Sequence, residues 1–185
     1  MTRLISFEPL RDFFHRRQAT RLDEQAAGLQ LVIERSASQR GTFVFPGTDT
    51  VATVEVDGQH VGHVDYGRNP LGDRLYINMI QIDPGRQRAG IGLAVLWQLW
   101  RQHLVPIVPI HQYASSDGFW YRARRRLAAA GAVLEPQLRA EQLDAAKQRW
   151  QHLVPESEAE RTIREYWAWV AAEHAAGRPA GPGIR

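Results

Sequence analysis

The sequence predicts a mixed α/β fold, in which a mainly antiparallel central sheet is flanked by helices and followed by a helical C-terminal extension. Two patterns predict this fold. Apolar residues alternate with polar ones between about residues 43 and 82, and before and after this stretch they recur every third or fourth position. The chain has 185 residues, of which 44% are hydrophobic, so it is long enough to bury a sizeable core.

A short strand and two successive helices are expected first. Leu4–Phe7 is the candidate strand, and Pro9–Arg17 suits a helix because proline is favoured in the first turn. Thr20–Arg35 is predicted as a second helix with a threonine N-cap and apolar residues at helical spacing. The apolar stripe of the first helix consists of Leu10, Phe13 and Phe14.

Strands are expected in the middle of the chain. Phe43–Phe45 is a candidate short strand. Val51–Val56 and His60–Tyr66 predict a hairpin, because the Asp-Gly pair between them fits a tight two-residue turn. A further turn leads into a strand over Arg74–Ile82, which makes three consecutive antiparallel strands.

Helices and strands alternate after this point. The predicted elements are a largely buried helix over Leu93–Leu104, a strand over Val105–Ile110, a polar loop over Ala114–Gly118, a helix over Phe119–Ala130 that stops at Gly131, and a possible last strand at Val133 and Leu134.

The predicted domain organisation is a core over residues 1–135, a helical extension over residues 136–177 and a disordered tail over residues 178–185. In the extension, Ser157 and Glu160 form a capping box at a helix start. The helices of the extension either wall a binding cleft or form a homodimer interface through Trp150, Trp167 and Trp169.

Several classes of site and location are excluded by composition. Cysteine is absent, so disulfides, thiol nucleophiles and thiolate metal sites are excluded. His60 and His63 are the closest histidine pair, but on a strand they point to opposite faces, so no metal site is expected. Without a long apolar run or a signal peptide, a soluble cytoplasmic protein with no membrane partner is expected.

Arginine supplies nearly all of the positive charge. The formal net charge is +3 and the pI is about 9.7, and Lys147 is the sole lysine. The functional interpretation is an anionic partner such as a nucleotide cofactor or RNA, and the alternative is the base composition of the source genome. The densest cluster is either a solvated helix face or a contact to cofactor phosphate or nucleic acid. It consists of Arg122, Arg124, Arg125 and Arg126.

A glycine-containing junction, Ile82–Gly92, is the segment that points most directly to a ligand. It joins a predicted strand to a predicted helix. Unpaired N–H groups and the positive end of the helix dipole converge at such a junction, which suits a phosphate group. An ordinary strand-to-helix turn is the alternative interpretation.

The order of elements and the junction together resemble the GNAT superfamily of acetyl-coenzyme A dependent N-acetyltransferases. The family signature is Gln or Arg, two variable residues, Gly, one variable residue, then Gly or Ala. Gln87-Arg88-Ala89-Gly90-Ile91-Gly92 fits it in full, and Ile82-Asp83-Pro84 matches the apolar-x-Pro that commonly precedes it. The resemblance covers about Leu4 to Val133.

This resemblance implies acetyl-CoA as the cofactor, with its pyrophosphate on the loop amides and its pantetheine arm against the preceding strand. The family usually has a bulge in that strand, and a backbone N–H there polarises the acyl carbonyl. The implied cofactor-binding residues are Ile80, Gln81, Ile82, Gln87, Arg88, Ala89, Gly90, Ile91 and Gly92. Ser116, with its neighbours, either caps the following helix or contacts the cofactor.

Catalytic residues are marked less clearly. Many family members use the Tyr of a Phe-Tyr pair as general acid, whereas this chain has Phe119-Trp120-Tyr121 and reaches Gly131 later than the family's Gly-Phe. Tyr121 is the first candidate acid, and packing is the alternative role. The remaining candidates are Tyr113 as a second acid, and Glu55 and His111 as bases, unless water carries the proton.

Three functions follow from the resemblance. The first is acetyl transfer to a primary amine, carried by a small molecule or a peptide, by direct attack in a ternary complex. The second is an acyl-CoA-binding or interaction module that has lost catalysis through the tryptophan at position 120. The third is a toxin-like acetyltransferase that acts on aminoacyl-tRNA, which the arginine content allows.

Overall fold

The computed structural model describes residues 9–110, 112 and 114–178. The chain divides into a first compact unit that ends at Leu153 and a second that begins at Val154. The expected strand at Leu4–Phe7 lies outside the described residues, as does nearly all of the expected tail. Among the helices of the described ranges, none is long and apolar enough to cross a membrane.

A five-stranded sheet in the order β1-β2-β3-β4-β5 forms the centre of the first unit. The first four strands are antiparallel to their neighbours, and the last is parallel to β4. The predicted fold class, a mainly antiparallel sheet flanked by helices, is therefore confirmed. The strands are β1 (Leu29–Ala37), β2 (Thr48–Val56), β3 (Gln59–Arg68), β4 (Leu75–Ile82) and β5 (Ile107–Pro109).

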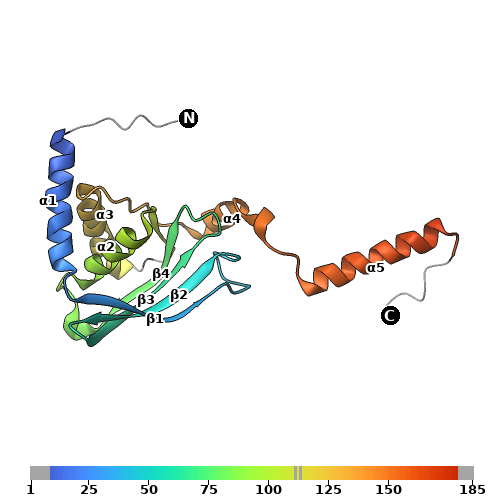
Figure 1. The fold of residues 1–185 in the computed structure, drawn as a ribbon, viewed down its shortest axis with the longest axis horizontal. Coiled ribbons are helices and arrows are strands. Elements are labelled where there is room, and N and C mark those ends of the chain that lie inside the picture. Colours follow the sequence, from blue (N-terminus) through green and yellow to red (C-terminus); the bar gives the residue numbers. More distant parts are fainter. Residues whose placement is uncertain (1–8, 111, 113, 179–185) are drawn as a thin grey trace. The chain divides into compact units, whose positions relative to one another are not determined.

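Three helices, α1 (Pro9–Gln25), α2 (Ile91–His103) and α3 (Asp117–Ala129), lie on one side of this sheet (Figure 1). The apolar side of α2 supplies much of the main core, as its dense apolar pattern predicts. Trp97 is almost fully buried, and its indole N–H donates to Asp23 of α1 at 2.9 Å. This bond satisfies the polar atom of a core residue and joins two helices.

The prediction of a second helix over Thr20–Arg35 is wrong. A single helix, α1, continues to Gln25, and the Thr20 hydroxyl donates to the Arg16 carbonyl inside it rather than capping a new helix. Gly28 then adopts a φ of +78°, and β1 follows as an edge strand beside β2. An edge strand has only one neighbour and is partly exposed, so its apolar residues do not follow a clean period of two.

The prediction of a strand at Phe43–Phe45 is also wrong. This segment is a turn on the face of the sheet away from α1, α2 and α3, where it belongs to a second core cluster. Trp150 is fully buried there, and its indole N–H donates to the Phe45 carbonyl at 3.1 Å. Phe43 packs edge-on against Trp150 with ring centroids 5.6 Å apart.

The hairpin prediction is confirmed. β2 and β3 are joined at Asp57 and Gly58, whose φ values of 51° and 74° are both positive, as this tight turn requires. The helix predicted to stop at Gly131 ends there as well, since α3 is followed by Gly131 with a φ of +84°. The possible last strand is reduced to one parallel bridge between Ile107 and Leu134.

Helices also form the C-terminal extension, as predicted. α4 (Ala140–Gln148) belongs to the first unit, and α5 (Glu158–Ala175) belongs to the second. The predicted capping box is present, because Ser157 accepts from the Glu160 N–H while Glu160 reaches back to the Ser157 N–H.

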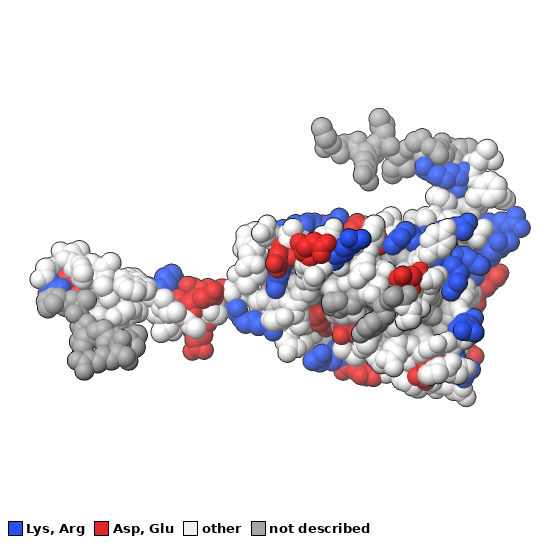
Figure 2. Space-filling model, turned by 180° about the vertical axis from the view of Figure 1, so that it is seen from behind, with Lys and Arg blue, Asp and Glu red and all other residues white. Residues whose placement is uncertain are grey.

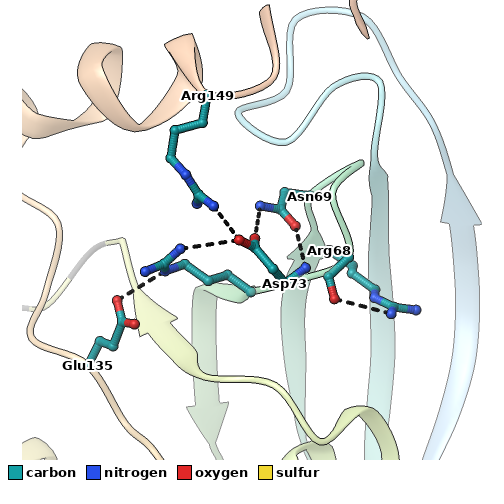
Figure 3. Close-up of polar contacts among 7 residues, drawn as sticks. Arg68, Asn69, Asp73, Glu135 and Arg149 are labelled. Atoms are coloured by element: carbon teal, nitrogen blue, oxygen red, sulfur yellow. Dashed lines mark hydrogen bonds and ion pairs between the residues drawn. The ribbon is translucent and has the colours of Figure 1, made fainter. Parts of the chain in front are cut away.

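Charged side chains of both signs are scattered over the visible face of the first unit, and arginines gather at the end where α1 lies (Figure 2). At the opposite end of β3 and β4 from the glycine loop, a polar network centres on the carboxylate of Asp73 (Figure 3). Asp73 accepts hydrogen bonds from Asn69 at 2.7 Å and from Arg149. Arg74 bridges the same carboxylate, at 3.5 Å, and Glu135, at 3.2 Å.

This network joins the β3–β4 turn to the end of α4 and to the chain after α3. Burial, the largest single influence on Asp73, opposes its ionisation. Hydrogen bonds from Asn69 and Arg149, with the charges of Arg149 and Arg74, outweigh burial and lower the pKa of Asp73. The ionised form therefore binds Arg149, which is next in sequence to Trp150 of the second core cluster.

Replacing this carboxylate is expected to lower stability in a pH-dependent way. Because the folded-state pKa of Asp73 lies below the unfolded value, its contribution is present above about pH 4 and is lost as pH falls through the folded pKa. Asp73→Asn should cost about 1 kcal/mol at neutral pH, since the network is partly exposed. Thermal unfolding at pH 7 and pH 3 measures this, and an equal loss at both pH values would contradict it. Asp144→Asn, an exposed aspartate of α4, is the control.

Candidate functional site

The Gln87–Gly92 loop leads into α2, includes its first two residues and presents a row of free backbone donors. Within the described chain, none of the N–H groups of residues 88–92 donates a hydrogen bond. Arg88 and Gly90 both have positive φ values, of 64° and 84°. The Gln87 side chain donates to the Ile82 carbonyl at 2.9 Å and fixes the loop to the end of β4. Such a set of donors at a helix start suits an anion.

Two side chains from distant parts of the sequence contact the glycines of the loop. The amide of Gln25, the last residue of α1, contacts Gly90 so closely that a β-carbon there would overlap it. Phe119, near the start of α3, covers Gly92, where a β-carbon would lie 3.1 Å from its ring. A side chain at Gly90 would displace the flexible Gln25 amide, and one at Gly92 would need a small shift of the Phe119 ring. The stronger constraint is the positive φ of Gly90, which favours glycine.

Beside the loop, β4 and β5 part after only three paired positions. The parallel register runs from Leu75–Ile107 to Ile77–Pro109, and the Ile110 N–H then donates to the Ile77 carbonyl. In the described ranges, no strand pairs with residues 78–82 of β4 on that side. The result is an open strand edge that leads toward the glycine loop.

A β-bulge lies at the point where the strands part. Asp65 of β3 pairs with Met79 and the next residue, Tyr66, pairs with Ile77, so Asn78 is the extra residue. Because the Asp83 N–H donates back to β3, strand alternation directs the N–H groups of residues 80 and 82 into the gap. The resemblance predicted a bulge and a backbone donor in this strand.

Carboxylates meet the bulge on the face of the sheet away from α1, α2 and α3. The Asn78 amide donates to Asp65 of β3 at 2.9 Å and lies 3.5 Å from Asp49 of β2. The second oxygen of Asp49 is buried and has no hydrogen-bond partner among the described residues. These carboxylates lie on the other side of β4 from the gap, so they are acceptors for an amine or ammonium that approaches the bulge over this face of the sheet.

The predicted cofactor-binding residues separate into two groups. Residues 87–92 form the loop, and residues 80–82 form the end of the open β4 edge. Ile80 packs against the main core while Gln81 is exposed, so backbone rather than side chains is available to a ligand in the gap. Ser116 is the N-cap residue of α3. The structure gives the positions of these residues, and their contacts with a cofactor stay predictions.

The predicted catalytic residues are not gathered around the gap. Tyr121 is 60% exposed, and at 100° per residue it lies about 200° around α3 from Phe119, the residue that covers the loop. Glu55 lies on β2, which is two strands from β4. It is also four residues, or about 13 Å, further along β2 than the residue that lies level with the bulge. His111 and Tyr113 lie outside the described residues. The catalytic role of each stays a prediction.

Sequence reasoning missed the residues that tertiary structure brings to this site. Asp49, Asp65 and Asn78 come from three strands, and their meeting depends on a bulge that no local pattern marks. Gln25 reaches the loop from α1, and the sequence prediction placed the end of this helix at the wrong residue. The turn signal that marks this end is Gly28, which follows two alanines.

Among the described residues, neither a metal site nor the surface depression suggests a different location for the functional site. The described residues contain no group of three or more His, Asp or Glu side chains placed to hold a metal ion. A shallow depression of about 300 Å³ is lined by Gly47, Thr48 and residues 68–72. It lies at the far end of β3 and β4, about 20 Å from the loop along the strand, and includes none of the predicted site residues.

Comparisons with known proteins add little to what the geometry indicates about function. No family model matches the sequence, and no curated protein matches it. One matching solved structure is a candidate acetyltransferase of the GNAT family from Desulfovibrio desulfuricans, with 23% identity and a TM-score of 0.35. The match covers 40% of this chain and 53% of the other chain, about half of its length. A similarity of this extent carries no argument about function.

Proposed function

We propose that this chain is a GNAT-type N-acetyltransferase that moves an acetyl group from acetyl-CoA to a primary amine. The observation that carries the proposal is the continuity between the free amides of residues 88–92 and the open edge of β4. The amides would hold the pyrophosphate of coenzyme A, and the edge would pair with the amide-containing pantetheine arm. The thioester would then lie at the bulge.

The bulge is a suitable place for the reaction because two kinds of group meet there. The N–H of Ile80 faces the gap and would stabilise the negative charge that develops on the acyl oxygen. On the far face, Asp65 would accept the proton that the attacking amine loses, and the Asn78 amide orients its carboxylate. The C–N bond forms as the C–S bond breaks, and the thiolate takes a proton from a separate donor.

One observation favours the second candidate, an acyl-CoA-binding module. In the resembling family, the acidic tyrosine precedes a Gly-Phe by about four residues. Counting back from Gly131 gives Leu127, which is fully buried and has no proton to donate. A thiol-release assay with acetyl-CoA and a panel of amines separates the candidates, since binding of acetyl-CoA with no turnover on any amine favours the module.

Loss of the loop conformation is expected to abolish cofactor binding. Gly90→Val introduces a β-branched residue at a φ of +84° and displaces Gln25. The strain of about 1–3 kcal/mol moves the amides, so the Kd for CoA should rise about tenfold or more. Isothermal titration with CoA measures this, and circular dichroism verifies that the helices remain.

Gly85→Val is a matched control in the short turn that leads into the loop. Gly85 has no positive φ, and nothing lies within 4 Å of a β-carbon built there. This variant should bind CoA like the wild type. Equal CoA affinity in the Gly90 variant and the wild type would reject the loop assignment.

Asp65 is expected to affect turnover more than cofactor binding. Asp65→Asn keeps an acceptor for the Asn78 amide but removes the basic carboxylate, so kcat should fall by about 100-fold or more. The Kd for CoA should not change, because Asp65 lies on the face away from the helices. The same measurements on Asp144→Asn control for the altered net charge. An unchanged kcat in the Asp65 variant would leave water as the proton acceptor.

A further inference from the structure

The positive charge of the protein is concentrated on two helices. α1 and α3 together hold eight arginines and four carboxylates, a net charge of +4. The whole chain has a formal net charge of +3, so the remaining residues are close to neutral. The two helices contact each other, with His15 of α1 against Gly131 at the end of α3, so their charges belong to one region of the first unit.

Most of these arginines lack an ionic partner. Seven of the eight are exposed, and among the described residues six of these seven make no ion pair with a carboxylate, Arg11 being the exception. Several lie on the outer side of the helices, and Figure 2 shows arginine side chains gathered at the end of the unit that contains α1. The six are Arg16, Arg17, Arg21, Arg122, Arg125 and Arg126.

Exposed aromatic rings lie among these cations. Phe13 and Phe14 of α1 are 58% and 57% exposed, and Tyr121 of α3 is 60% exposed. The guanidinium of Arg125 lies over the Tyr121 ring, 5.7 Å from its centroid. Arginines that track phosphates, together with open rings on which bases stack, are the two components of a surface for single-stranded nucleic acid.

We propose that the outer faces of α1 and α3 bind single-stranded nucleic acid. α1 alone has 17 residues and spans about 25 Å, which is more arginine-bearing surface than the terminal phosphate of one CoA needs. An anionic membrane fits less well, because the outer side of α3 offers Tyr121 beside Arg125 and Arg122 instead of an apolar face. The proposal does not depend on acetyl transfer.

The charge component is tested by salt-dependent binding. Fluorescence anisotropy with labelled RNA and DNA strands of the same mixed sequence, about 12 nucleotides long, is measured at several salt concentrations. The wild type should bind at low salt with a steep negative log–log slope. Arg122→Ala/Arg125→Ala/Arg126→Ala should weaken binding at least about tenfold and reduce the slope by about 2, at roughly 0.7 per lost phosphate contact.

The stacking component is tested at constant salt. Tyr121→Ala should weaken binding by about tenfold with little change in slope, while Tyr121→Phe, which keeps the ring, should bind like the wild type. Arg35→Ala/Arg161→Ala removes two exposed arginines elsewhere and is the matched control, expected to have no effect. A fully paired duplex of the same length should bind more weakly than either single strand.

Three outcomes would overturn the proposal. These outcomes are no binding of either strand at low salt, equal binding by the triple variant and the wild type, and binding of anionic vesicles with the same variant dependence in place of oligonucleotides. The relative affinities for RNA and DNA show which backbone is preferred. Gly90→Val should still bind the oligonucleotides, so failure of the acetyltransferase proposal is distinguishable from failure of this one.

Discussion

The short pairing between β4 and β5 is the constraint on which the site depends. Where the strands pair, Leu75, Ile77 and Ile107 close the main core. Directly beyond, the bulge at Asn78 changes the direction of β4 and leaves its edge without a strand neighbour in the described residues. An open edge is usually a liability because unpaired backbone groups attract other strands. A fold that keeps one in its interior provides a place for a ligand whose own amides complete the pairing.

The glycine loop is held in place by residues that lie outside it. α2 is anchored along its length by buried residues, including Trp97, and its first amides are therefore fixed in direction. Gln25 and Phe119 then press on the glycines from two other helices. Donors that are fixed before a ligand arrives need no reorganisation when charge is placed among them, which is what makes them effective for anions and for developing charge.

Local chemistry explains which features the sequence predicts. The hairpin at Asp57 and Gly58, the buried α2 and the glycine loop each depend on residues close together in sequence, and all three were found. The helix assigned beyond Gln25 fails because an edge strand lacks a regular apolar period, and Gly28 was not recognised as the end of α1. The meeting of strands at Asn78 depends on register across three strands, and local patterns do not encode register once a bulge intervenes.

The distribution of arginine bears on the two interpretations of composition, which are an anionic partner and the base composition of the source genome. A bias in the source genome acts on every codon, so it would spread arginine along the chain. Instead α1 and α3, which are 17 and 13 residues long, hold eight of the 22 arginines, more than twice an even share. Some arginines elsewhere are paired into structure, as Arg74 and Arg149 are with Asp73. Unpaired cations that face water in one region oppose folding through mutual repulsion, and an anionic partner relieves that repulsion when it binds.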